Sequence, residues 1–260
     1  MKQFVLFAIL CFISLGAFAQ DDLFGKKTAT DNTKPVVHHG WLIGANGNLD
    51  IPGGDMAKRF GLSYRVGPSV MYKTAKNWFF GVKGDFILGN QVHQDSLMAN
   101  IKDHTGHLMT DDGSRVNPGL SERGYMIGIS AGKLFNTSKK NADNGIMVLA
   151  TAGFIQHKIR IISNGNSIPE IRGDYVKGYD RLTNGMFVEG YAGYAFFGRD
   201  GLLNFNLGID IAAGFTQGRR DYLFDVMRPD NQSRVDILFG LRGTWYIPMF
   251  KHKSDEYMFE

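Results

Sequence analysis

The sequence predicts an all-β protein, an eight-stranded antiparallel transmembrane β-barrel that occupies residues 38–250. Three observations support this prediction. Eight segments alternate between large apolar residues and small or polar ones with a period of two, which is the period of a β-strand. The connections between these segments are alternately long and short, as in outer-membrane barrels. Finally, the chain begins with an apolar run of the kind found in export signals.

Residues 1–19 are predicted to be a cleaved signal peptide. Lys2 supplies a positive charge, residues 4–18 are almost entirely apolar, and Ala17 and Ala19 place small residues before a cut at Gln20. A transmembrane helix is the alternative, but a membrane span needs ~20 apolar residues and this run is shorter. Cys11, the only cysteine, would leave with the signal, so the mature chain is expected to have no disulfide and no thiol nucleophile. The polar residues 20–37 are predicted to form a flexible lead-in.

Composition indicates one β-rich domain and argues against nucleic acid as a partner. The 33 glycines and the 13% of aromatic residues suit a protein with many turns, while 21% of residues are charged. About 240 residues remain after cleavage, which is a common size for a single large β-barrel. The formal net charge of +4 is small and dispersed along the chain, unlike the basic patches that bind nucleic acid.

Each predicted strand has bulky apolar residues at every second position. The first four strands carry Trp41, Ile43, Ala45 and Leu49; Leu62, Tyr64, Val66, Val70 and Tyr72; Trp78, Phe80, Val82, Phe86 and Leu88; and Tyr125, Ile127, Ile129 and Ala131. The last four carry Met147, Leu149, Ile155, Ile159 and Ile161; Met186, Val188, Ala192, Tyr194 and Phe196; Leu203, Phe205, Leu207, Ile209, Ile211, Ala213 and Phe215; and Val235, Ile237, Phe239, Leu241, Trp245 and Ile247. The fifth strand is less regular, because Phe154 and His157 fall on the wrong faces, which indicates a bulge or a misregister. By parity, His157 is expected to face lipid.

The predicted connections span residues 51–59, 74–77, 91–121, 136–144, 163–184, 198–201 and 217–233. Apart from the modest first one, the odd connections are long and the even ones are short. Outer-membrane barrels have this asymmetry, with brief periplasmic turns and longer external loops. Because eight is an even number, both termini are expected at the periplasmic end.

The opposite face of the predicted strands combines small residues with ionisable ones. The ionisable residues are Arg65, Lys83, Asp85, Lys158, Arg160, Glu189, Asp210, Asp236 and Arg242. The interior of an eight-stranded barrel is only just wide enough for side chains, so eight rows of bulky residues would overfill it. We therefore expect the bulky face to point outward into lipid, with every backbone group bonded inside the closed sheet. The predicted membrane-facing residues include Trp41, Tyr64, Phe80, Phe205, Ile209, Phe239 and Trp245.

Aromatic residues cluster near the predicted strand ends, where barrels have aromatic girdles at the membrane interfaces. These residues are Trp41, Tyr72, Trp78, Tyr125, Phe135, Tyr194, Phe196, Trp245 and Tyr246. The ordinary preference of strands for aromatic residues is the alternative explanation.

Seven inward-facing ionisable residues are the main candidate site. They are Arg65, Lys83, Asp85, Glu189, Asp210, Asp236 and Arg242. In a narrow lumen these charges must pair, because an unpaired buried charge is strongly unfavourable. The set could be an ion path or gate, or a structural network that plugs the barrel. The narrow interior favours the structural network.

The third connection contains a second candidate site. Its ionisable residues are His93, Asp95, Asp103, His104, His107, Asp111 and Asp112. His104 and His107 could ligate a divalent metal if this segment were helical, but no zincin-type spacing is present. A solvated loop is the interpretation we adopt, so no metal and no cofactor are predicted. No serine, histidine and carboxylate arrangement for acyl hydrolysis is evident, and no catalytic residue is predicted.

The signal peptide, the eight alternating segments, the loop asymmetry and the aromatic last strand at 235–247 together resemble the small outer-membrane β-barrel superfamily. This group includes OmpA-, OmpX- and OmpW-like barrels and the PorT-like barrels of Bacteroidota. The resemblance implies a cell outer-membrane location, outer-membrane lipid as surroundings and another envelope protein as a candidate partner. One departure is that residues 251–260 continue as a polar tail, predicted to be periplasmic, where members usually end at a terminal aromatic residue.

These features favour a non-enzymatic envelope protein that acts as an accessory, partner-binding or surface-interaction subunit. A small-solute channel that uses the polar lumen is the first alternative. A lipid-modifying enzyme is the second.

Overall fold

The computed structural model describes residues 37–94, 96–139, 141–163, 168–198 and 203–250. The predicted signal peptide, nearly all of the predicted lead-in and the predicted polar tail lie outside these ranges.

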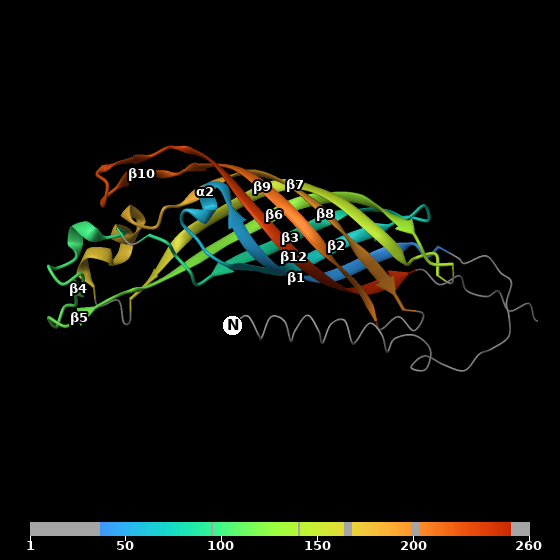
Figure 1. Ribbon diagram of the computed structural model, residues 1–260, viewed down its shortest axis with the longest axis horizontal. Helices are drawn as coiled ribbons and strands as arrows, with labels where there is room; N and C mark the ends of the chain where they lie inside the picture. The colour runs from blue at the N-terminus through green and yellow to red at the C-terminus, as the bar shows by residue number, and fades with distance from the viewer. Residues whose placement is uncertain (1–36, 95, 140, 164–167, 199–202, 251–260) are drawn as a thin grey trace, which may run out of the picture. The chain divides into compact units, whose positions relative to one another are not determined.

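Eight strands form a closed antiparallel barrel in the order β1-β12-β9-β8-β7-β6-β3-β2 (Figure 1). The strands are β1 (Gly40–Gly53), β2 (Ser63–Lys73), β3 (Trp78–Gly89), β6 (Gly119–Asn136), β7 (Gly145–Ile162), β8 (Thr183–Phe197), β9 (Asn204–Gly218) and β12 (Ser233–Phe250). The first strand pairs with the last, with Gly40 opposite Phe250, so the sheet has no free edge and both ends of the barrel chain lie at the same rim. The predicted eight-stranded antiparallel barrel is confirmed.

The connections are short at one end of the barrel and long at the other. Short connections of residues 74–77, 137–144 and 198–203 join neighbouring strands at one end of the barrel, which we call the turn end. The long connections contain α2 (Gly54–Ala57), η1 (Ala99–Ile101), β4 (Leu108–Met109), β5 (Arg115–Val116), η3 (Pro169–Ile171), η4 (Gly173–Gly178), β10 (Arg220–Leu223) and β11 (Arg228–Asp230). We call the described residues of 54–62, 90–118, 163–182 and 219–232 the crown, drawn on the left of Figure 1. The predicted alternation of long and short connections is therefore present.

The crown is a packed structure. The ring of Phe224 lies 5.6 Å from the ring of Tyr179 and 6.4 Å from that of Tyr175, measured between centroids. A Cβ atom at Gly178 would lie 2.1 Å from the Phe224 ring, so glycine is needed where this ring meets the backbone of η4. These contacts join the third long connection to the fourth.

Two apolar clusters fill the two ends of the barrel interior. The crown-side cluster includes Met56, Phe60, Ile87, Leu97, Leu108, Met126, Ile155, Ile159, Ile171, Tyr179 and Phe187. The turn-side cluster consists of Leu42, Met71, Phe79, Leu134, Met147, Leu149, Tyr191, Ala195, Phe197 and Tyr246. The interior is thus more apolar than the sequence prediction allowed. That prediction compared whole rows of side chains, whereas the large inward residues are confined to the two ends.

The exterior of the barrel is bulky and apolar. The structure places the seven residues predicted to face the membrane on this surface, and between 42% and 53% of each is exposed: Trp41, Tyr64, Phe80, Phe205, Ile209, Phe239 and Trp245. Tyr246 is different, because this predicted girdle residue is fully buried inside the bore and its hydroxyl accepts a hydrogen bond from the Asn206 amide at 2.8 Å.

The predicted orientation of the fifth strand, β7, was wrong. Met147, Leu149, Ile155 and Ile159 point inward and are buried, while Lys158 and Arg160 are exposed on the outside. β7 pairs with β6 in one continuous register, so the predicted bulge is absent from this strand pair. The error arose because β7 is apolar on both faces, with Ile146 and Val148 outside and the isoleucines packed in the crown-side cluster. Alternation alone does not determine which face of such a strand points into the barrel.

Candidate functional site

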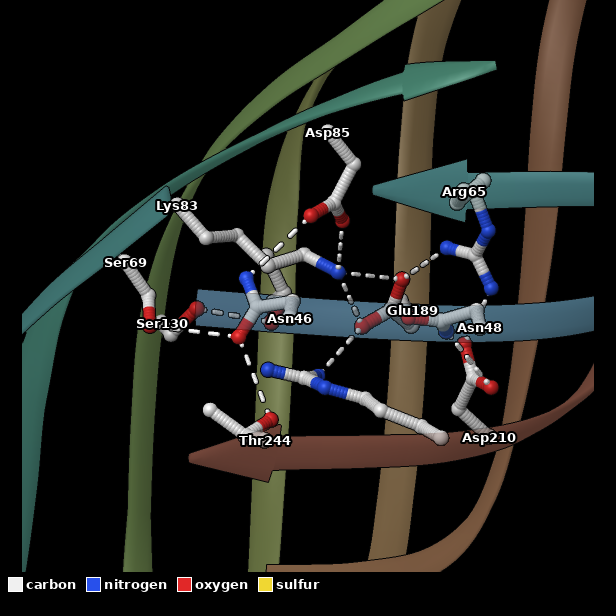
Figure 2. Close-up of polar contacts among 12 residues, drawn as sticks. Asn46, Asn48, Arg65, Ser69, Lys83, Asp85, Ser130, Glu189, Asp210 and Thr244 are labelled. Carbon is white, nitrogen blue, oxygen red and sulfur yellow. Dashed lines mark hydrogen bonds and ion pairs between the residues drawn. The ribbon is translucent and has the colours of Figure 1, made fainter. Parts of the chain in front are cut away.

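A layer of ionised side chains crosses the middle of the bore between the two apolar clusters. We call it the bore network, and it consists of Asp50, Arg65, Lys83, Asp85, Glu189, Asp210 and Arg242. Figure 2 shows the side chains of Arg65, Lys83, Asp85, Glu189 and Asp210 pointing toward one another, and the seven residues come from strands β1, β2, β3, β8, β9 and β12. At most 3% of any member is exposed. The bore network is therefore isolated from solvent, and its charges depend on one another.

Arg65 is the centre of the bore network. Its Nε and Nη2 atoms donate to the two carboxylate oxygens of Asp50 at 2.7 and 2.8 Å, a bidentate pair. The same guanidinium also donates to Glu189 at 2.8 Å and to Asp210 at 2.5 Å. The planar fork of arginine suits this role, because one rigid cation can bond several carboxylates in fixed directions.

Glu189 is the corresponding acidic centre. Lys83 Nζ donates to its two oxygens at 2.6 and 2.7 Å, and Arg242 Nη1 donates to Oε1 at 3.2 Å. Lys83 also pairs with Asp85 at 2.9 Å. With Arg65, three cations thus surround one carboxylate, which compensates for the loss of its hydration.

Neutral side chains complete the layer. The amide nitrogens of Asn46 and Asn48 donate to Asp85 and Asp210 at 3.2 and 3.1 Å. The hydroxyls of Ser69 and Thr244 donate to the Asn46 oxygen at 3.2 and 3.1 Å. The four carboxylates and three cations of the bore network give it a formal charge of −1.

Gly240 provides the space that two of the carboxylates occupy. A Cβ atom at this position would lie 2.2 Å from an oxygen of Asp50 and 2.6 Å from an oxygen of Asp210. Both carboxylates are held by Arg65, so neither can withdraw without losing an ion pair. The layout of charges therefore requires a residue without a side chain at this point of β12.

Asp236 belongs to a separate group closer to the crown. Its carboxylate bonds His157 Nε2 at 2.9 Å, Arg59 Nη2 at 3.3 Å and the Thr216 hydroxyl at 2.5 Å. The structure thus places six of the seven predicted lumen residues in one network and Asp236 beside it. His157 is fully buried, which corrects the prediction that it faces lipid. The cause is that the face of β7 predicted to meet lipid points into the barrel, where the Asp236 carboxylate bonds the His157 imidazole.

Asp50, Asn46, Asn48 and Arg59 contact members of the predicted site but were absent from it. Asp50, Asn46 and Asn48 have the inward parity of β1, so this signal was available in the alternation of the first strand. Arg59 follows α2 in the first connection, and its guanidinium reaches Thr183 at 3.0 Å inside the barrel. No periodic pattern extends to that position, so the sequence carried no signal for it.

The third connection is organised by turns. Asp103 accepts hydrogen bonds from the Thr105 hydroxyl at 2.6 Å and the His107 backbone at 2.9 Å, and it pairs with Arg115 at 2.8 Å. These bonds hold the pKa of Asp103 well below its usual value, and the hydrogen bond from the Thr105 hydroxyl has the largest effect. Asp111 pairs with Arg172 across the crown. Within the described ranges, no three histidine, cysteine or acidic side chains are grouped as a metal site would require, and Asp95 lies outside those ranges.

In the described part of the chain, no helix has the length and apolarity needed to cross a membrane.

Comparison with known proteins gives similarity only at the level of solved structures. No family model and no curated protein sequence matches the chain. Neisserial surface protein A is similar with 10% sequence identity and a TM-score of 0.40, covering 79% of this chain and 96% of that one. Ail, the attachment invasion locus protein of Yersinia pestis, solved with the heparin analogue sucrose octasulfate, has 12% identity and a TM-score of 0.38, covering 80% and 98%. The outer membrane protein OprG from Pseudomonas aeruginosa has 8% identity and a TM-score of 0.32, covering 82% and 97%. The fold assignment itself rests on the closed strand pairing of this chain.

Proposed function

We propose that the protein is a non-enzymatic outer-membrane β-barrel that does not conduct solutes and that binds a partner protein through its crown. The observation that carries this proposal is the contrast between the two parts of the barrel. The bore is filled by an ion-paired layer between two apolar clusters. The crown is packed and presents apolar side chains beyond the barrel wall.

The exterior of the barrel supports placement in a membrane. Contiguous apolar surface of this extent is unfavourable in water and favourable in lipid. A closed antiparallel sheet also bonds all backbone groups of its strands internally, as a hydrocarbon environment requires. The expectation of outer-membrane lipid around the barrel follows from these two properties.

The filled bore supports a structural role for its charges. Each cation of the bore network lies within 3.2 Å of a carboxylate oxygen, and apolar residues lie toward both ends. An ion path needs sites that an ion can enter and leave. The His157–Asp236 pair is buried and is therefore closed to any substrate.

The crown supports the partner-binding role. Tyr175, Tyr222, Val226 and Met227 form what we call the crown patch, with exposed fractions of 63%, 46%, 42% and 72%. Tyr175 and Tyr222 both pack on Phe224, so the crown patch is held on an ordered base. Exposed aromatic residues and methionine on an ordered surface are typical of protein interfaces.

We expect the purified protein to show no steady unitary openings in planar bilayers at physiological salt. The physical reason is that the paired charges and the two apolar clusters fill the bore. A porin inserted in the same bilayers serves as the positive control. Reproducible openings that scale with salt would assign the protein to the small-solute channel class instead.

We expect a photoreactive amino acid at Tyr222 to give one discrete protein adduct in intact cells. The matched control is the same group at Asp221, which is exposed and adjacent on β10 but lies outside the crown patch. Equal adducts from the two positions, or none from Tyr222 in the membranes of the native host, would contradict a partner site at the crown patch.

A further inference from the structure

A groove of about 460 Å³ lies on the outer wall of the barrel, directly below the crown. Its walls come from β8, β9, the start of β12 and α2. The groove lies outside the bore and is separate from the crown patch.

The groove has an apolar part and a polar part, which lie next to each other on the outer face of the barrel. Met186, Phe215 and Val235 are neighbours in register on three strands and are 61%, 60% and 46% exposed. Two residues further toward the crown, the register places Asn184, Gln217 and Ser233 side by side. Beyond them on the β9 side lies Arg219. The outer surface thus changes from apolar to hydrogen-bonding to cationic within a few residues.

This change falls where the hydrocarbon layer should end. The outward residues of β9 are apolar from Phe205 to Phe215, ten positions along the strand. Ten positions extend roughly 33 Å along a strand at ~3.3 Å per residue. At a tilt of ~40° this corresponds to about 25 Å along the membrane normal, which is the height of the apolar band in such barrels. Phe215 therefore marks one edge of the band, and Arg219 lies at the level of lipid headgroups.

Arg219 is the uncompensated charge of the groove. Among the other charged groups that line it, Asp55 pairs with Lys58 at 2.8 Å and accepts the Val235 amide at 3.0 Å, and Arg234 pairs with Asp230 at 2.5 Å. Arg219 donates Nε to the Asn184 oxygen at 2.6 Å. In the described part of the chain, its two terminal amino groups have no carboxylate partner.

We propose that this groove binds one lipid with an anionic phosphate headgroup, which Arg219 holds while the acyl chain lies on Met186, Phe215 and Val235. The hydrogen bond to Asn184 fixes the guanidinium and leaves the fork of terminal amino groups for two phosphate oxygens. The amide of Gln217 and the hydroxyl of Ser233 are further donors at the same level. This inference rests on the membrane placement proposed above.

The test is native mass spectrometry of the full protein released from vesicles that contain equal amounts of phosphatidylglycerol and phosphatidylcholine. We expect wild type to retain one phosphatidylglycerol in preference to phosphatidylcholine. Arg219→Gln should lower that retention about tenfold, the effect of losing a charge-assisted phosphate contact. Arg228→Gln, which removes an exposed arginine of β11 outside the groove, is the matched control and should leave retention unchanged.

Each other outcome has a defined meaning. Equal loss in the two arginine variants, or equal retention of both lipids by wild type, would overturn the groove proposal while leaving membrane placement intact. Binding of inorganic phosphate to the detergent-solubilised protein, with no lipid preference, would overturn the lipid as the occupant. Failure of wild type to insert into vesicles would overturn both the placement and the groove.

Discussion

Replacing Arg65 with methionine is expected to destabilise the barrel by about 3–5 kcal/mol, the usual cost of removing one partner from a buried ion pair. Methionine fills a similar volume but leaves Asp50, Glu189 and Asp210 without their shared cation. The measurement is the urea dependence of unfolding in lipid vesicles. Arg65→Lys should cost less, because the charge remains while the bidentate geometry is lost.

Two further sets of variants separate the bore network from general damage. Combining Arg65→Met with Asp210→Asn should recover part of the loss, because one unpaired carboxylate is removed. Gly240→Val should also destabilise, since its side chain would displace the carboxylates of Asp50 and Asp210. Gly190→Val is the matched control, because a Cβ atom at Gly190 meets nothing within 4 Å. Similar losses in Gly240→Val and Gly190→Val would show that the bore charges are not closely packed.

Ile209→Arg is expected to destabilise the protein in lipid vesicles by about 2–4 kcal/mol, the cost of an arginine near the bilayer midplane. Ile209 lies near the middle of the apolar exterior of β9 and is 50% exposed. The same urea titration measures the effect. Tyr222→Arg is the control, with a similar exposed fraction of 46% in the crown. If both variants were equally stable, the exterior around Ile209 would not be facing hydrocarbon.

The architecture could be predicted from the sequence because each strand of a closed barrel has one outer and one inner face, which gives its residues a period of two. On most strands the outward residues are mainly bulky and the inward residues near mid-strand are mainly small or charged, so parity identifies both faces. The same parity brought Arg65, Lys83, Glu189 and Arg242 into one predicted set. Their convergence follows from the narrow interior, which leaves charged side chains of facing strands no other place.

The remaining features depend on contacts that alternation does not encode. β7 is apolar on both faces, because its inward isoleucines pack beneath the crown. Arg59 enters the bore from a connection that has no regular period. The fold of the crown rests on contacts such as Phe224 on η4, which join residues of two separate connections. Each of these requires knowledge of a distant partner, so each appears only in three dimensions.

The pairing of β1 with β12 has a consequence for how the chain reaches its final state. These two strands lie about as far apart in the chain as two elements of this barrel can, and their contact is what makes the cylinder continuous. Bringing such remote segments together carries a loop-closure entropy that local hairpins do not, so ring closure should come late in assembly. Asp50 and Arg242 lie on those two strands, on opposite sides of the final seam. In a sheet that has not yet closed, the charges of the bore network would be only partly paired. The full stabilisation from these ion pairs is gained only when β1 and β12 come together.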